Sequence, residues 1–495
     1  MSARRTENGD TERGAAPAGE LAQVQRVCPP GQAAIPGQET GEREPFGIAE
    51  HRLDGDESGG GVVVVIGHLP GTAETRKTRA AVRPRKVVIV PAGYSVGISR
   101  AGEHTGAMGR MVTAVVTHGG ACAGLVGPFP VDNPWWAEVE PVVTHLEETL
   151  GVPTVVLRLL SVEGSDGARD GHVTYHAEAF QPPGDLAPCD FVNDDHPLRL
   201  PWARASGVRE LFRWASRYVD LAGQPVQRKT WNLAGLFRLP TAFGSVWLKA
   251  IPAFAAAEPA AIAAFAEVDP NLVPAVLASA PGRLLLADVP GTDCWDPSSQ
   301  VVAEAVHRLA TAQARIGRPS HAIPDRRPEV LAAAVRDLLD GPVDTELSPG
   351  ELRTAKSLQW RWEMLTDCGL PDTVVHGDFH PGNWRCGDGA PVVLDFADAH
   401  LGNPVLDGLR AIDYLPPDRR RTAASAWIAA WTAAVPRSRP AEALRIAEPL
   451  AHLAYAVRYQ EFLDNIEPSE RVYHLGDPAA AIRQALACAP IEGGT

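Results

Sequence analysis

The hydrophobic pattern of the chain changes twice along its length. Between residues 112 and 180, short apolar runs lie on either side of one amphipathic stretch, which predicts two strands, a helix over 135–150 and two more strands. Three alternating runs then predict an antiparallel meander, and beyond residue 300 the apolar positions recur at helical spacing. The expected strands cover 112–116, 123–126, 154–162, 172–180, 225–230, 233–239, 245–250 and 283–286, and the later helices cover 201–222, 259–268, 300–316, 327–339, 349–365, 419–434, 440–456 and 478–486. The pattern therefore indicates an α+β protein with a mostly helical second half.

The beginning of the chain has a different composition. Residues 1 to about 60 are rich in Gly, Pro, Ala, Glu and Arg, contain almost no aromatic side chains and show no periodicity. Such a composition buries too little surface to offset the conformational entropy that is lost on ordering. Two short apolar runs, 62–66 and 87–91, interrupt the Gly-rich stretch that follows. We therefore predict a mostly disordered leader over residues 1–110.

The most informative stretch of the sequence covers residues 374–407. Asp378 follows a short apolar strand, and an Asp-Gly pair between two later apolar runs predicts a hairpin. Folding this hairpin brings Asn383 and Asp395 together at its open end. One amide oxygen and one carboxylate suit Mg²⁺, which keeps waters and takes further ligands from phosphates. Asp378, on the loop before the hairpin, is placed to accept a proton from a hydroxyl.

The same stretch also allows a transition-metal site. His376, Asp378 and His380 lie within five residues, and with Asp395 they would suit zinc in a metal-dependent hydrolase. That interpretation leaves the hairpin and Asn383 without a role. We therefore favour the magnesium interpretation and expect both histidines to hold the loop through hydrogen bonds.

At these residues the chain resembles the aminoglycoside phosphotransferase and choline kinase-like family, a branch of the protein-kinase fold. That family carries H-G-D-x-x-x-x-N followed by D-F or D-W, and residues 376–383 and 395–396 fit both motifs. Residues 402–407 are similar to its G-D-P-x-x-D segment, with Asn403 where Asp is commoner. The resemblance covers about residues 225–486 and implies a bilobal fold, with a small antiparallel-sheet N-lobe and a mostly helical C-lobe.

The resemblance also implies an activity, namely transfer of the γ-phosphate of ATP to a hydroxyl of a small molecule such as an aminoglycoside, sugar or amino alcohol. In this assignment Asp378 is the catalytic base, Asn383 and Asp395 hold Mg²⁺, and ATP and Mg²⁺ are the cofactors. A catalytically inactive, nucleotide-binding regulator with the same fold is the alternative. The presence of every catalytic polar residue disfavours that alternative.

Lysine is rare in this chain, with five lysines against 41 arginines, so Lys249 within a predicted strand is informative. The family's third strand carries a phosphate-binding lysine, and Lys249 matches its position. A planar guanidinium would not replace the compact ammonium there. In the family a glutamate of the next helix pairs with this lysine, and either Glu258 or Glu267 fits. The stretch around Ala287 and Val289 resembles the hinge between the lobes, whose backbone would bind adenine.

The chain thus divides into four expected regions: the leader 1–110, a small α/β capping domain at 111–200, a kinase-like N-lobe at 201–290, and a helical C-lobe with the catalytic loop at 291–495. The capping domain carries no cluster of catalytic type. Trp135 and Trp136, at the start of its helix, allow a sugar site, but aromatic residues at such a place are more typical of a core. We expect this domain to pack on the kinase body.

Composition and charge restrict the partners. The net charge of −14 argues against nucleic acid and against a basic membrane-binding surface, although it would suit a cationic acceptor. No apolar stretch approaches the ~20 residues needed to span a bilayer, and the N-terminus lacks the apolar core of a signal peptide. Seven widely spaced cysteines without a C-x-x-C pair fit reduced thiols in a cytosol. We expect a cytoplasmic monomer or homodimer whose partner is a small-molecule hydroxyl acceptor.

Overall fold

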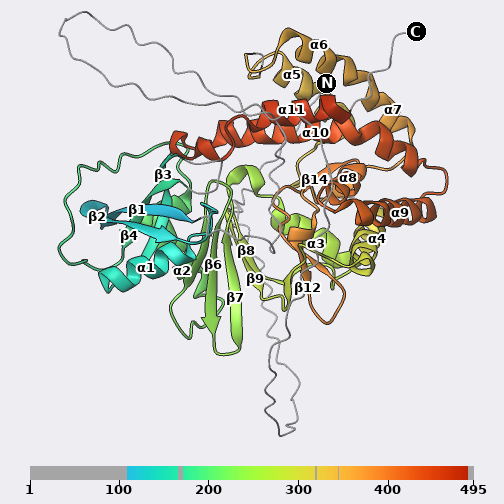
Figure 1. Cartoon of the computed structure of the whole chain (residues 1–495). Helices are drawn as coiled ribbons and strands as arrows, with labels where there is room; N and C mark the ends of the chain where they lie inside the picture. The colour runs from blue at the N-terminus through green and yellow to red at the C-terminus, as the bar shows by residue number, and fades with distance from the viewer. Residues whose placement is uncertain (1–108, 165–170, 318–319, 344, 489–495) are drawn as a thin grey trace, which may run out of the picture. The chain divides into compact units, whose positions relative to one another are not determined.

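The computed structural model describes residues 109–164, 171–317, 320–343 and 345–488, so the leader predicted over 1–110 lies outside the described residues except for its last two positions. The described residues form a four-stranded sheet, then a five-stranded sheet, then a mostly helical region (Figure 1). The five-stranded sheet and the helical region are the two lobes of a protein-kinase-like fold. The predicted α+β, bilobal architecture is confirmed.

The four-stranded sheet belongs to the small α/β domain. Its strands run in the order β2-β1-β4-β3, with β1 and β4 parallel and both outer pairs antiparallel. The fully buried Val142 and Leu146 join α1 to the core of this sheet. The elements are β1 (Arg110–His118), β2 (Ala121–Val131), α1 (Glu140–Leu150), β3 (Thr154–Glu163) and β4 (His172–Ala179).

Helix α1 begins at Glu140, whereas the sequence predicted a helix from residue 135. The segment before it makes backbone hydrogen bonds to the second sheet instead. Thr230 N donates to Ala137 O at 3.0 Å, and Val139 N donates to Arg228 O at 3.1 Å. The predicted start was wrong because hydrophobic spacing does not reveal a pairing between segments that are distant in sequence.

The five-stranded sheet has the order β5-β6-β7-β9-β8, and all neighbours are antiparallel, as the predicted meander requires. Strand β8 was not predicted, because its Ala and Ser residues have weak β propensity. Helix α2 contributes Leu211 and Trp214 to a buried cluster with Phe237 and Leu248 of the sheet. The elements are α2 (Ala205–Ala215), β5 (Val226–Thr230), β6 (Gly235–Thr241), β7 (Gly244–Ala250), α3 (Glu258–Val268), β8 (Val276–Ala280) and β9 (Arg283–Ala287).

The helical region differs from the prediction in several places, and helix α8 (Val405–Asp413) was not predicted. The helix expected over 349–365 is interrupted by a 3₁₀ turn at Leu358–Trp360, and the helix expected over 440–456 continues to Asn465. Within the described residues, no helix combines the length and apolar character needed to cross a membrane. The elements are β10 (Thr292–Asp293), α4 (Ser299–Arg315), α5 (Pro328–Leu339), α6 (Pro349–Ser357), α7 (Arg361–Asp367), β11 (Thr373–Val375), β12 (Trp384–Cys386), β13 (Val392–Val393), β14 (His400–Gly402), α8 (Val405–Asp413), α9 (Pro417–Ala434), α10 (Pro440–Asn465) and α11 (Asp477–Cys488).

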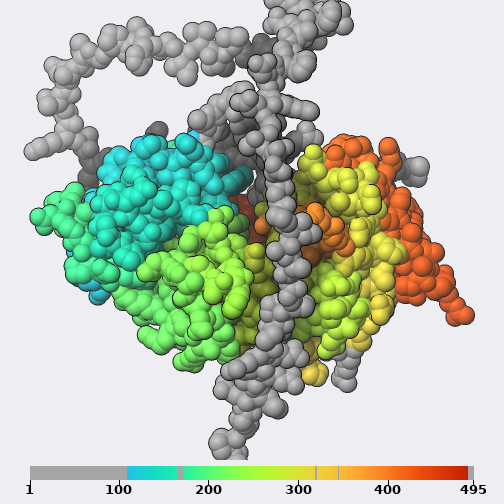
Figure 2. All heavy atoms as spheres, turned by 90° about the horizontal axis from the view of Figure 1, so that it is seen from below, coloured from blue at the N-terminus to red at the C-terminus, as the bar shows by residue number. Residues whose placement is uncertain are grey.

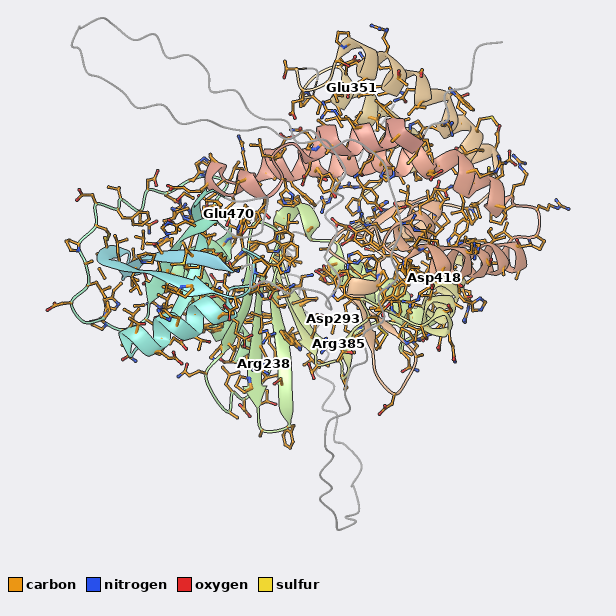
Figure 3. All side chains as sticks on the ribbon, viewed as in Figure 1. Arg238, Asp293, Glu351, Arg385, Asp418 and Glu470 are labelled. Carbon is orange, nitrogen blue, oxygen red and sulfur yellow. A yellow bond between two sulfur atoms is a disulfide. The ribbon has the colours of Figure 1, made fainter. Side chains whose placement is uncertain are left out.

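The small domain contacts both lobes. Its surface lies against that of the five-stranded sheet (Figure 2), where β3 and α1 contact β5. The 3₁₀ helix Pro468–Tyr473, which follows α10, packs on β3. There Arg158 and Arg199 both pair with the buried Glu467, at 3.4 and 3.1 Å. Glu470, labelled in Figure 3, accepts a hydrogen bond from the backbone N–H of Leu159 at 3.3 Å.

This contact makes folding stability depend on pH. Burial raises the pKa of Glu470 to about 8, against 4.5 for an ordinary glutamate. Because the folded-state pKa is raised, the contribution is fully present below about pH 4.5 and is lost as pH rises through 8. Between pH 5 and 8 we expect the melting temperature of the parent to fall relative to that of Glu470→Gln, whose neutral amide does not titrate. Differential scanning calorimetry measures both. Glu148→Gln, on the exposed side of α1, is the matched control, and an unchanged slope in Glu470→Gln would contradict the assignment.

The cysteines differ from the prediction. The structure pairs Cys122 with Cys189 and Cys294 with Cys386, so the expectation of reduced thiols was wrong for these four. The pairs are 67 and 92 residues apart in sequence, and the second forms because β10 and β12 become neighbouring strands. The spacing of cysteines therefore no longer argues for a reducing compartment.

Candidate active site

The hairpin predicted from the Asp-Gly pair is present. Strands β12 and β13 pair antiparallel, with Trp384 opposite Val393. Directly beyond them Leu394 N donates to Asn383 O at 2.8 Å. Asn383 and Asp395 therefore lie beside each other at the open end of the hairpin, as expected from the sequence.

The loop before the hairpin is held by one buried carboxylate. Asp407 of α8 accepts hydrogen bonds from the backbone N–H groups of His376 and Gly377, at 2.7 and 2.9 Å, and from Gln313 at 2.7 Å. Gly377 has φ 86°, and a Cβ there would lie 2.2 Å from the carbonyl oxygen of Asp398. Only glycine fits this position, so the loop has one defined backbone path.

His376 has a structural role, as predicted. Its Nε2–H donates to the carbonyl oxygen of Leu394 at 2.9 Å, and its Nδ1 accepts from Asp378 N at 3.2 Å. With both ring nitrogens occupied, His376 cannot also bind a metal. Within the described ranges, no group of three or more His, Cys, Asp or Glu side chains is placed to hold a metal ion. The zinc alternative is therefore not supported.

Asp378 lies in a strongly polar environment. Its Oδ1 accepts from Nε and Nη2 of Arg410 at 2.8 and 2.7 Å, and its Oδ2 faces Asn383 Nδ2 at 3.1 Å and His380 Nε2 at 3.4 Å. Burial opposes ionisation of this carboxyl, but Arg410 and His380 outweigh burial and hold its pKa well below the usual value. Asp378 is therefore an ionised hydrogen-bond acceptor.

Asn383 and Asp395 have the donor atoms that Mg²⁺ prefers. The Nδ2 of Asn383 donates to the backbone oxygen of Asp378 at 2.9 Å, which leaves its Oδ1 for a cation. Asp395 is about half exposed, and its Oδ1 lies 2.7 Å from Lys249 Nζ. Its φ of 62° places this non-glycine residue in the left-handed region. One amide oxygen and one accessible carboxylate fit a Mg²⁺ whose other ligands are waters and phosphate oxygens.

Lys249 pairs with Glu258. Its Nζ lies 2.8 Å from the Glu258 carboxylate, and both side chains are buried, at 8% and 1% exposure. Glu267 is exposed on the outer side of α3. Burial opposes the charge on Lys249, but Asp395 and Glu258 together raise its pKa, so the ammonium is retained. Pro259 does not prevent the pairing, because the first residue of α3 already points at β7.

The hinge residues are partly engaged within the protein. The N–H of Ala287 donates to Ala275 O at 2.9 Å, and the carbonyl of Val289 accepts from Arg385 Nε at 3.2 Å. Arg385 also pairs with Asp293 at 2.7 Å, and both are labelled in Figure 3. These two backbone groups would have to exchange their partners to bind adenine.

A cavity of about 520 Å³ is lined by Lys249, Asp378, Asn383 and Asp395. Ala287 and Val289 are not among its lining residues. Its walls also include residues that the sequence analysis did not assign, apart from Trp135 and Trp136, which it considered for a sugar site. The sequence does not show that these residues meet, because they come from separate parts of the fold. They are Trp135 to Glu138 of the small domain, Lys229 and Trp231 of the sheet, Arg410 and Tyr414 of the α8 segment, Tyr455, Arg458, Tyr459 and Phe462 of α10, and Tyr473, His474 and Asp477 beyond it.

Arg410 is the most consequential of the missed residues. Its guanidinium lies between the rings of Tyr414 and Tyr455, 4.4 and 4.5 Å from their centroids, and it binds Asp378. Arg410 comes three residues after Asp407, so both lie on one side of α8. This spacing in the sequence could have indicated that Arg410 faces the same loop as Asp407.

Several known proteins resemble this chain. Residues 237–443 match the family model described as phosphotransferase enzyme family. Similar solved structures include a choline/ethanolamine kinase family protein from Mesorhizobium loti (15% identity, TM-score 0.42, 56% of this chain and 98% of that chain), a choline kinase from Streptococcus pneumoniae (11%, 0.43, 57% and 99%) and a macrolide 2′-phosphotransferase from Brachybacterium faecium (20%, 0.38, 58% and 100%). No curated protein matches the sequence.

Proposed function

Because residues 237–443 match the family model described as phosphotransferase enzyme family, we propose that this protein transfers the γ-phosphoryl group of ATP to a hydroxyl of a small molecule. The observation that carries the proposal is the constellation of an ionised Asp378, an adjacent Asn383 and Asp395, and a buried Lys249–Glu258 pair around one cavity. Phosphoryl transfer needs these parts in this arrangement, since its catalysis is mostly positioning and charge stabilisation.

Each residue then has a defined task. Lys249 binds phosphate oxygens of the nucleotide, and Glu258 keeps its ammonium in place. Asn383 Oδ1 and the Asp395 carboxylate hold Mg²⁺. When bound, Mg²⁺ supplies positive charge to the phosphates and to the leaving group. These two ligands and Lys249 thus fix the end of the nucleotide that reacts.

Asp378 acts on the acceptor. Its carboxylate orients the hydroxyl and takes the proton as the hydroxyl oxygen bonds to the γ-phosphorus. The bond between that phosphorus and the β–γ bridging oxygen breaks, and ADP leaves with the electron pair. Arg410 and Asn383 hold the carboxylate in position during this step.

We also propose the division into a capping domain at 111–200, an N-lobe at 201–290 and a C-lobe at 291–495. The linker near Ala287 and Val289 is proposed to bind adenine once their present partners are exchanged.

Acceptor-dependent release of ADP by the purified protein tests the proposed function. A coupled assay with MgATP and a panel of hydroxyl compounds should show ADP formation above the rate without acceptor. The second candidate, a nucleotide-binding regulator, predicts MgATP binding in calorimetry without release of ADP for any acceptor. The complete set of polar side chains around the cavity favours the enzyme.

Removing Arg410 should change the pH profile of turnover. Asp378 works as a base above its pKa, which Arg410 lowers. In Arg410→Met the apolar stem remains between Tyr414 and Tyr455, but the charge is lost, so the acidic limb of kcat/KM should move up by about 1–3 pH units. Arg419→Met removes a surface pair with Asp296 and should leave the limb in place. If the acidic limb of kcat/KM stayed at the same pH in Arg410→Met, a group other than Asp378 would determine it.

A further inference from the structure

One part of the cavity wall is built from aromatic side chains around His474. The imidazole of His474 lies 6.0 Å from the ring of Trp231, 6.2 Å from Tyr459 and 5.0 Å from Phe462, centroid to centroid. The ring of Tyr473 lies 5.8 Å from Trp231. All five residues line the cavity.

Polar atoms in this part of the cavity wall lack partners within the described part of the chain. His474 is buried, with 6% of its surface exposed. Its Nδ1 lies 3.3 Å from Asp477 Oδ2, whereas its Nε2 has no hydrogen-bond partner among the described residues. The hydroxyl groups of Tyr455 and Tyr473 are likewise buried without a partner there. Buried polar groups are nearly always hydrogen-bonded in native proteins, to protein or to ordered water, so these three atoms can take a polar group of a ligand or a water as partner.

Most charges of the cavity wall are paired. Its lining includes six carboxylates and five lysines or arginines, and five of the six carboxylates pair with a lysine or arginine, while Asp477 faces His474. Glu138 pairs with Lys229 at 2.8 Å, and Asp398 pairs with Arg458 at 2.7 Å. A polycationic acceptor would have to break such pairs. The remaining pairs are Asp293–Arg385, Asp378–Arg410, Asp395–Lys249 and Asp477–His474.

These observations favour one class of acceptor. We propose that the acceptor is an uncharged, ring-bearing hydroxyl compound, whose ring lies among Trp231, Tyr459 and Phe462 and whose polar groups bond to His474 Nε2 and the hydroxyls of Tyr455 and Tyr473. The phosphoryl transfer to it rests on the proposed function, but the binding does not. Trp231, Tyr455, Tyr459, Tyr473 and His474 all lie outside the segment that matches the phosphotransferase family.

Several features of the site agree with this class. The aromatic side chains offer apolar faces on which a ring can lie, and the tyrosines add hydroxyl groups that can bond to the hydroxyls of the ligand. A site built to hydrogen-bond a hydroxyl also discriminates strongly against ligands that cannot satisfy it. The acidic net charge of the whole chain had suggested a cationic acceptor, but the pairing of the cavity carboxylates removes that argument.

Direct binding to the full-length protein is the first test. Calorimetric titration and saturation-transfer NMR compare methyl β-glucoside, phenyl β-glucoside, glucosamine and choline, with and without a non-hydrolysable ATP analogue. We expect at least one glucoside to bind at least ~10-fold more tightly than glucosamine and choline. A preference for the methyl compound identifies a sugar ring as the recognised group, and a preference for the phenyl compound identifies an aromatic ring. Tighter binding of glucosamine or choline, or no binding of either glucoside at millimolar concentration, would overturn the proposal.

Variants assign the binding to these residues. Tyr473→Phe and His474→Asn should each weaken glucoside binding by ~10-fold or more, because Phe lacks the hydroxyl and Asn keeps a polar atom near Nδ1 but none at Nε2. Affinity for the ATP analogue should stay unchanged, which also shows that the variants are folded. Tyr218→Phe, whose ring is 45% exposed outside the cavity, is the matched control. Equal glucoside affinity in the parent and in both site variants would overturn the proposal.

The same samples separate this inference from the proposed function. Glucoside binding that depends on His474, together with no release of ADP for any acceptor, would reject phosphoryl transfer and retain the binding site. Release of ADP with a cationic acceptor, unaffected by Tyr473→Phe and His474→Asn, would retain the kinase and reject the uncharged acceptor.

Discussion

Replacing Asp378 by asparagine is expected to lower kcat by ~10²-fold or more and to leave the affinity for MgATP nearly unchanged. The amide keeps the size of the side chain and one acceptor oxygen, but it cannot take the proton of the hydroxyl. Asp378 faces Arg410, Asn383 and His380, so the amide retains part of this network. Steady-state kinetics and titration with a non-hydrolysable ATP analogue measure the two quantities separately.

Asp395→Asn is the matched variant, because it makes the same chemical change at the proposed metal ligand. Here Mg²⁺-dependent nucleotide binding and turnover should fall together, since a neutral amide is a weaker ligand for Mg²⁺. If Asp378→Asn lost nucleotide binding while Asp395→Asn kept it, the two roles would be reversed. If neither substitution affected turnover, phosphoryl transfer at this site would be rejected.

Lys249→Ala should impair both stability and nucleotide use. The substitution leaves Glu258 buried at 1% exposure without its cation, and breaking such a pair costs about 3–5 kcal/mol of the free energy of unfolding. The KM for ATP should rise strongly in the same variant, because the phosphates lose their ammonium. Urea denaturation and kinetics measure the two effects. Lys356→Ala, which removes an exposed lysine on α6, should change neither.

A double substitution separates the two effects of Lys249. In Lys249→Met with Glu258→Leu, apolar side chains replace the ion pair, and such a replacement is often neutral for stability. We expect the double variant to recover most of the lost stability while ATP use stays impaired. Recovery of ATP use together with stability would show that Lys249 serves the fold and not the nucleotide.

The hairpin that carries Asn383 and Asp395 could be predicted because its signals are local. The Asp-Gly turn determines which residues meet, so Asn383 and Asp395 follow from short-range chemistry alone. Lys249 could be singled out because lysine is so rare in this chain. The fold class followed from a switch in hydrophobic period, which is also a property of neighbouring residues.

The aromatic part of the cavity wall could not be predicted, because it depends on the tertiary arrangement. Trp231 lies in the turn between β5 and β6, whereas His474 follows the 3₁₀ helix near the end of the chain. Tyr455 and Tyr459 share one side of α10 at i and i+4, but that spacing does not say which surface the side meets. The position of Trp135 was similarly misjudged, since pairing of residues 137–139 with β5 moves it out of the helix.

The left-handed backbone conformation at Asp395 restricts which residue types can occupy this position. For most L-residues this conformation costs roughly 1–2 kcal/mol, asparagine and aspartate tolerate it best, and glycine adopts it freely. The protein thus retains a backbone conformation at Asp395 that glycine would adopt more easily. In a duplicated gene freed from selection for turnover, glycine at this position would ease the local backbone while removing the proposed metal ligand. Close relatives with glycine here are therefore expected to be folded pseudoenzymes.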